Sequence, residues 1–319
     1  MDPVAKDRAV DGNDDIRMFD SYVFYVWSVD RCTPGMYAPR GFRGSIRHCL
    51  IAILLLGHAA SDARAGSYLD ATELFAIGAV SGGVLQLGNH LKTIPEGRGP
   101  RFTGHLPFEE SFQRWLGGTC KVGKQNFLDD SFGSFITPAI GAVVLTGVNI
   151  AYPYDTRGKD ASQDLFLYLT GLVATKGISN TTKGTIARER PFVCILKDSV
   201  DTNSEYGSSY SQHSFFSGHA SSAFFATGYL NLRIRSSMRQ RMSPDRYDDW
   251  KWVSSSMLYG WATVVALSRV HAYKHHLFDV MAGAAAGMLL SELFYNLPKD
   301  PDTANASSTP IPVRIVFRF

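Results

Sequence analysis

Six stretches without Asp, Glu, Lys or Arg recur along the chain, and each is long enough to form a helix covered on most of its surface. They lie at 74–90, 135–152, 165–175, 217–232, 252–268 and 280–291. Few β-branched runs alternate within them as strands do. The sequence therefore predicts an all-α fold, a helical bundle of about six core helices around a functional site. The closing "IPVRIVFRF" (311–319) alternates apolar with other residues and predicts a C-terminal β-strand or tail.

Polar residues are mixed into most of these helical stretches. Residues 252–268, "WVSSSMLYGWATVVALS", are typical, and the mean hydropathy of −0.07 is low for a polytopic membrane protein. These features favour a soluble or peripherally attached domain, and helices that span a membrane are the alternative. The net charge of +3 is small, and no basic stripe is interleaved with aromatic residues, which argues against a nucleic-acid partner.

Residues 40–65 have the layout of a secretory signal. In "RGFRGSIRHCLIAILLLGHAASDARA", three arginines precede a short apolar run, and a small-x-small site ends at Ala65. Export predicts a periplasmic location, soluble or peripheral. The alternative is an inner-membrane protein whose active site faces the periplasm.

This signal divides the chain into four predicted parts. Residues 1–35 are a non-native or disordered extension, 36–65 the signal peptide, 66–297 the helical domain, and 298–319 a linker with the strand-like tail. In the helical domain, Cys120 and Cys194 could form a disulfide in an oxidising compartment, and two unpaired thiols fit equally well.

Three short blocks carry candidate chemistry, beginning with "KGTIARERP". It predicts Lys183 and Arg190 two helical turns apart on one face, before Pro191 ends the helix. In "FFSGHASS", Ser217, Gly218 and His219 precede an apolar helical stretch. Free backbone N–H groups and the helix dipole favour an oxyanion there.

The third block, "SRVHAYKHHLFD", adds Arg269 as another cation. With a helix from Lys274 onward, His275 and Asp279 stand at i and i+4, so Asp279 would hold one imidazole nitrogen protonated and leave the other free to attack. His271 and His276 are interpreted as surface or packing residues.

Together the blocks resemble the signature of the type 2 phosphatidic acid phosphatase and vanadium haloperoxidase superfamily. Two positions depart from it: Phe216 stands where Pro is common, and Tyr273 where Gly is frequent. The resemblance implies that Lys183, Arg190 and Arg269 neutralise a phosphate, with added hydrogen bonds from Ser217 and the Gly218 amide. It also implies that His275 attacks phosphorus while His219 serves as acid and then base, without a metal.

The expected activity is a metal-independent phosphatase acting on a phosphomonoester or lipid phosphate through a phosphohistidine. Its partner is then a phosphorylated small molecule or lipid head group, with peripheral membrane contact. Three alternatives remain: an integral-membrane lipid phosphate or isoprenyl diphosphate phosphatase, a vanadate-dependent haloperoxidase, and a non-catalytic anion-binding envelope protein. Vanadate is expected to be an inhibitor if the protein is a phosphatase, and the cofactor if it is a haloperoxidase.

Overall fold

The computed structural model describes residue 69 and residues 71–92, 106–116, 128, 130–152, 161–196 and 211–297. These residues form eight α-helices and one π-helical turn without any strand, which confirms the all-α prediction. The predicted signal peptide, Cys120 and the C-terminal strand lie outside the described residues. The elements are α3 (Ala71–Lys92), α4 (Pro107–Trp115), η1 (Phe132–Ile136), α5 (Thr137–Ala151), α6 (Ala161–Ile186), α7 (Pro191–Leu196), α9 (Gly218–Arg241), α10 (Pro244–His271) and α11 (Leu277–Tyr295).

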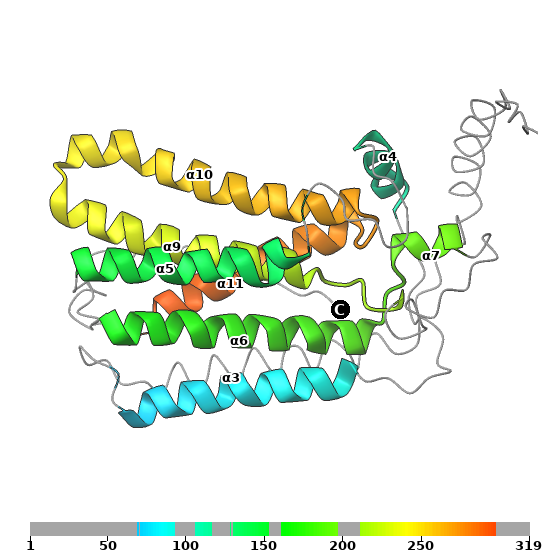
Figure 1. Cartoon of the computed structure of the whole chain (residues 1–319), viewed down its shortest axis with the longest axis horizontal. Coiled ribbons are helices and arrows are strands. Elements are labelled where there is room, and N and C mark those ends of the chain that lie inside the picture. Colours follow the sequence, from blue (N-terminus) through cyan, green and yellow to red (C-terminus); the bar gives the residue numbers. More distant parts are fainter. Residues whose placement is uncertain are drawn as a thin grey trace, which may run out of the picture.

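Six long rods make the bundle: α3, η1 with α5, α6, α9, α10 and α11 (Figure 1). Successive rods run in opposite directions. The ends of α3, α6 and α10 therefore meet the starts of η1, α9 and α11 at one end of the bundle. The short helices α4 and α7 lie at this same end, which we call the α4 end, and the α9–α10 turn lies at the opposite end.

The polar residues of these helices point into the bundle. Ser221, Thr227 and Asn231 of α9 are buried, and the exposed positions of α5 and α10 include Val143 and Met257, each 72% exposed. Polar residues of the described helices are therefore buried inside the bundle, while many large apolar side chains lie on its outer surface.

In the part of the chain that the structure describes, three segments are long and apolar enough to cross a membrane: Ala71–Lys92, Phe132–Ala151 and Leu277–Tyr295. A hydrocarbon core about 30 Å thick needs roughly 20 such residues. These segments and the apolar outer surface favour the membrane-spanning alternative over the soluble or peripheral domain. Polar residues within the helical stretches do not indicate a soluble domain here, because the sequence alone does not show that these side chains face the interior of the bundle.

Backbone contacts between small residues hold neighbouring helices together. A Cβ added to Gly88 of α3 would lie 2.4 Å from the carbonyl oxygen of Gly177 in α6, and one added to Gly287 of α11 would lie 2.3 Å from that of Ser221 in α9. Such close approach is typical of helix pairs in membranes, where dispersion contacts drive packing.

A buried ion pair holds the bundle at the end opposite α4. Arg233 Nε of α9 donates to Asp164 Oδ2 of α6 at 3.1 Å and to Asn149 Oδ1 of α5 at 2.9 Å. The Tyr229 hydroxyl donates to Asp164 Oδ1 at 2.7 Å. Three helices are therefore joined through one guanidinium.

We expect Arg233→Met to lower the free energy of unfolding by roughly 3–5 kcal/mol, because the substitution leaves the Asp164 carboxylate buried without its cation. Thermal unfolding in detergent measures this loss. Arg239→Met is the matched control, since Arg239 is exposed on the same helix and binds only the Tyr247 hydroxyl and ring among the described contacts. Equal melting temperatures for the two variants would contradict the assignment.

Candidate active site

The first block does not lie on one helical face. Helix α6 carries Lys183 in its last turn and ends at Ile186, and Ala187 follows with a φ of 48° in the left-handed region. The chain then runs out of the helix, and the Arg190 N–H donates to the Ser211 carbonyl at 2.8 Å. The predicted two-turn spacing of Lys183 and Arg190 is therefore wrong, because the helix ends before it reaches Arg190.

The second block begins α9 as predicted. Ser217 is the N-cap residue, and its Oγ accepts the Ala220 N–H at 3.4 Å. A Cβ added to Gly218 would lie 3.0 Å from Lys183 Nζ, so the N-terminus of α9 lies against the ammonium group of the first block. Behind it, Gly133 of η1 packs on His219, because a Cβ there would lie 2.6 Å from His219 Cβ.

The third block is a turn between two helices. Helix α10 ends at His271, Tyr273 has a φ of 54°, and α11 begins only at Leu277. Tyr273 is the position where the resemblance favours Gly, and a left-handed φ explains that preference. His275 therefore precedes the helix, and the predicted i, i+4 pair with Asp279 is wrong.

Asp279 instead caps α11. Its Oδ2 accepts the His276 N–H at 3.0 Å and the Ser214 hydroxyl at 2.5 Å, and its Oδ1 accepts from Arg188 at 2.5 Å. The His276 side chain completes the capping box, and its Nε2 lies 3.2 Å from the Glu189 carbonyl oxygen. The structure thus places His276 in the cap of α11.

The His275 ring is held by a backbone carbonyl. Its Nδ1 lies 2.7 Å from the Ser214 carbonyl oxygen, which can only accept, so Nδ1 carries the proton and Nε2 keeps its lone pair. Burial, together with the positive charges of Arg190 and Lys183, lowers the pKa of His275 well below its ordinary value. The ring is therefore neutral near pH 7, as attack by Nε2 requires.

The predicted cations gather around this histidine. Arg190 donates to the carbonyl oxygens of Lys274 at 3.1 Å and His213 at 3.2 Å, and the His275 N–H donates to the Arg269 carbonyl at 3.3 Å. Two buried donors of Arg269, Nε and Nη2, have no hydrogen-bond partner among the described residues. They are suited to bind an anion.

An acidic residue that the sequence did not single out lies on this cluster. Asp130 accepts from Arg269 Nη1 at 2.6 Å and from Lys274 Nζ at 2.6 and 2.8 Å. Burial alone would raise its pKa, but hydrogen bonds from these two cations hold the pKa of Asp130 well below its ordinary value. Asp130 therefore pairs with Nη1 of the Arg269 guanidinium, while Nε and Nη2 remain available to an anion.

Glu109, Arg188 and Ser214 were also missed by sequence reasoning. Arg188 lies inside the first block and Ser214 just before the second, so their positions were a usable signal. Glu109 lies in α4, far upstream of any block, and only the folded chain places it nearby.

Buried cations, the N-terminus of a helix and a neutral histidine meet at one end of the bundle. Such a set of groups is suited to phosphoryl transfer. Residues 164–301 match the PAP2 superfamily, which confirms the resemblance seen in the motifs.

Two curated relatives support the same family. The chain is 26% identical over 212 residues to lipid phosphate phosphatase 2 of Arabidopsis thaliana, covering 60% of this chain and 72% of the relative. It is 38% identical over 87 residues to a putative phosphatidate phosphatase of Drosophila melanogaster, covering 27% of this chain and 22% of the relative. No solved structure matches the chain.

Proposed function

We propose that the protein is an integral-membrane phosphatase that hydrolyses a lipid phosphate through a phosphohistidine. The observation that carries this proposal is the meeting of all three blocks at one end of a bundle whose outer surface is apolar. The names of both relatives, a lipid phosphate phosphatase and a putative phosphatidate phosphatase, point to the same substrate class.

In the proposed binding step, the phosphate group lies between the cations of the three blocks. Lys183, Arg190 and Arg269 neutralise its oxygens, and the Ser217 hydroxyl and the Gly218 N–H donate hydrogen bonds. Charge neutralisation and alignment supply most of the catalysis in phosphoryl transfer, which suits a site built from cations and a helix N-terminus.

In the proposed chemical steps, His275 Nε2 forms a bond to phosphorus while the bond from phosphorus to the lipid oxygen breaks. His219 gives its proton to that leaving oxygen, which departs as an alcohol. Neutral His219 then takes a proton from water as the water oxygen attacks phosphorus, and the bond from phosphorus to His275 breaks to release phosphate.

The alternation of the helices predicts the membrane topology. Six crossings would place residues 69 and 297 on one side and the α4 end on the other. The arginine-rich end of α9 then lies on the side opposite the active site, as the positive-inside tendency favours for the cytoplasm.

We test this topology with single cysteines in a chain whose native cysteines are replaced by serine. A membrane-impermeant maleimide on sealed spheroplasts should label Glu110→Cys, near the site, and leave Ser243→Cys, in the α9–α10 turn, unlabelled until the membrane is opened. Labelling of both positions in sealed cells would contradict six crossings.

We also expect phosphate release from phosphatidate in detergent micelles to continue in EDTA and to be inhibited by vanadate. Vanadate resembles the pentacoordinate transition state and would bind the same cations. Activity lost in EDTA and restored by magnesium or zinc would rule out the metal-independent mechanism. Halide oxidation with vanadate and peroxide, without phosphate release, would favour the haloperoxidase alternative, and neither activity would favour the non-catalytic one.

A further inference from the structure

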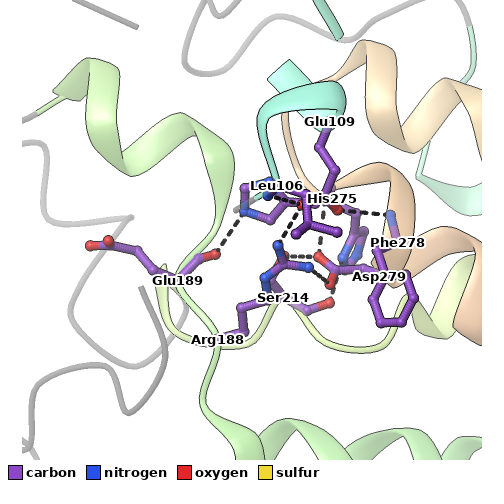
Figure 2. Close-up of polar contacts among 9 residues, drawn as sticks. Leu106, Glu109, Arg188, Glu189, Ser214, His275, Phe278 and Asp279 are labelled. Carbon is purple, nitrogen blue, oxygen red and sulfur yellow. Dashed lines mark hydrogen bonds and ion pairs between the residues drawn. The ribbon is translucent and has the colours of Figure 1, made fainter. Parts of the chain in front are cut away.

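A buried polar network connects α4 to the proposed nucleophile. Arg188 lies between two carboxylates: its Nη2 is 2.9 Å from Glu109 Oε2 and its Nη1 is 2.5 Å from Asp279 Oδ1 (Figure 2). The side chains of Glu109 and Asp279 are 0% exposed and that of Arg188 is 4% exposed. A guanidinium can serve both partners because its nitrogens form a rigid planar fork.

Glu109 also holds the start of α11. Its Oε1 accepts the Phe278 N–H at 2.9 Å, and its Oε2 accepts the Leu106 N–H at 2.7 Å. Burial alone would raise its pKa, but Arg188 and these N–H groups hold the pKa of Glu109 below its ordinary value. The carboxylate is therefore ionised at neutral pH and binds one of the free N–H groups of the first turn of α11.

Ser214 connects this network to the histidine. Its hydroxyl donates to Asp279, its N–H donates to the Arg188 carbonyl at 3.0 Å, and its own carbonyl oxygen accepts from His275 Nδ1. A shift of Arg188 or Asp279 would therefore move the carbonyl that sets the tautomer and orientation of the His275 ring.

We propose that Glu109 and Arg188 are positioning residues that act through Asp279 and Ser214 to fix His275 with its Nε2 lone pair toward the phosphate. This inference rests on the proposed phosphatase function. Glu109 and Arg188 bind the start of α11, Asp279 and the Ser214 backbone, so their replacement should slow the chemical step and leave substrate binding intact.

We expect Glu109→Gln to lower kcat about tenfold, with KM within about twofold of the wild type, in phosphate release from phosphatidate micelles. Glutamine can keep an oxygen acceptor for the Phe278 N–H, but it removes the negative charge that faces Arg188, and its amide nitrogen cannot accept from Leu106 or Arg188 as Oε2 does. Glu110→Gln, the neighbouring glutamate of α4, is the matched control and should retain wild-type kcat. A wild-type kcat in Glu109→Gln would overturn the inference while leaving the phosphatase function in place.

A double-mutant cycle separates positioning from general loosening of the fold. If Glu109 acts through Asp279, then Glu109→Gln should add less than about twofold to the loss already caused by Asp279→Asn. An undiminished tenfold loss in that background would overturn the proposed route. Where Glu109→Gln does not yield folded protein, Arg188→Lys, which keeps the charge but loses the fork, must show the same pattern.

A second readout does not depend on turnover. In the substrate-free protein, the ring ¹⁵N shifts of His275, assigned by their loss in His275→Ala, should report a single tautomer protonated on Nδ1. Glu109→Gln should show exchange between tautomers. A spectrum identical to the wild type would overturn the inference, even for a chain that hydrolyses no lipid phosphate.

Discussion

His275→Ala is expected to reduce phosphate release from phosphatidate by roughly 10⁴-fold or more, because the variant has no atom that can form the covalent intermediate. Because the ring is 1% exposed and binds the Ser214 carbonyl, the substitution also removes buried contacts, so kcat is compared only for variant protein shown to be folded. Initial rates in detergent micelles, with size-exclusion profiles as a check on folding, measure the effect.

His271→Ala and His276→Ala are the controls from the same block. His271→Ala should keep most of the activity. His276→Ala removes half of the capping box of α11 and should lower stability by about 1 kcal/mol, with most of the activity retained. A folded His276→Ala variant as inactive as His275→Ala would show that the nucleophile has been assigned to the wrong histidine.

Lys183→Met should lower kcat/KM by about 10²–10³ and leave the substrate-free protein at least as heat-stable as the wild type. Lys183 is 6% exposed, has no ion pair among the described residues, and feels the positive charges of Arg190 and Arg269. A buried cation without a counter-ion destabilises the free protein, and a bound phosphate relieves the repulsion.

A loss of activity without a loss of heat stability distinguishes a phosphate-binding lysine from a structural one. Lys251→Met is the control, since Lys251 pairs with Asp248 at the far end of the bundle and should change neither quantity. If Lys183→Met lowered the melting temperature by several degrees, Lys183 would be holding the fold together and its assignment to the phosphate would be wrong.

The motif residues were predictable from sequence, but their local geometry was not. The sequence correctly placed Ser217 at the start of a helix, because an N-cap serine before an apolar stretch is a local signal. It misplaced Arg190 and His275 on helices, because both helix ends depend on contacts between distant segments: the Arg190 N–H binds Ser211, and the His275 ring binds the Ser214 carbonyl. Helical spacing alone cannot register such contacts.

The membrane question shows a similar limit. Hydropathy averages the polar face of α9, which is buried against α6, α10 and α11, with the apolar faces that point outward. Asn231, for example, accepts from Ser254 and Ser255 of α10 inside the bundle. The sequence does not say which residues are buried. For a bundle with a polar interior, the average hydropathy of a helix is therefore lower than the hydropathy of its exposed face.

The most direct test of the proposed mechanism is to trap the intermediate. Wild-type protein is mixed with phosphatidate carrying ³²P, quenched in alkali within milliseconds and digested, and the labelled peptide is sequenced. We expect an alkali-stable, acid-labile label on His275, absent from His275→Ala. Steady phosphate release by the wild type with no label on any histidine, or with the label on His276, would contradict a phosphohistidine at His275.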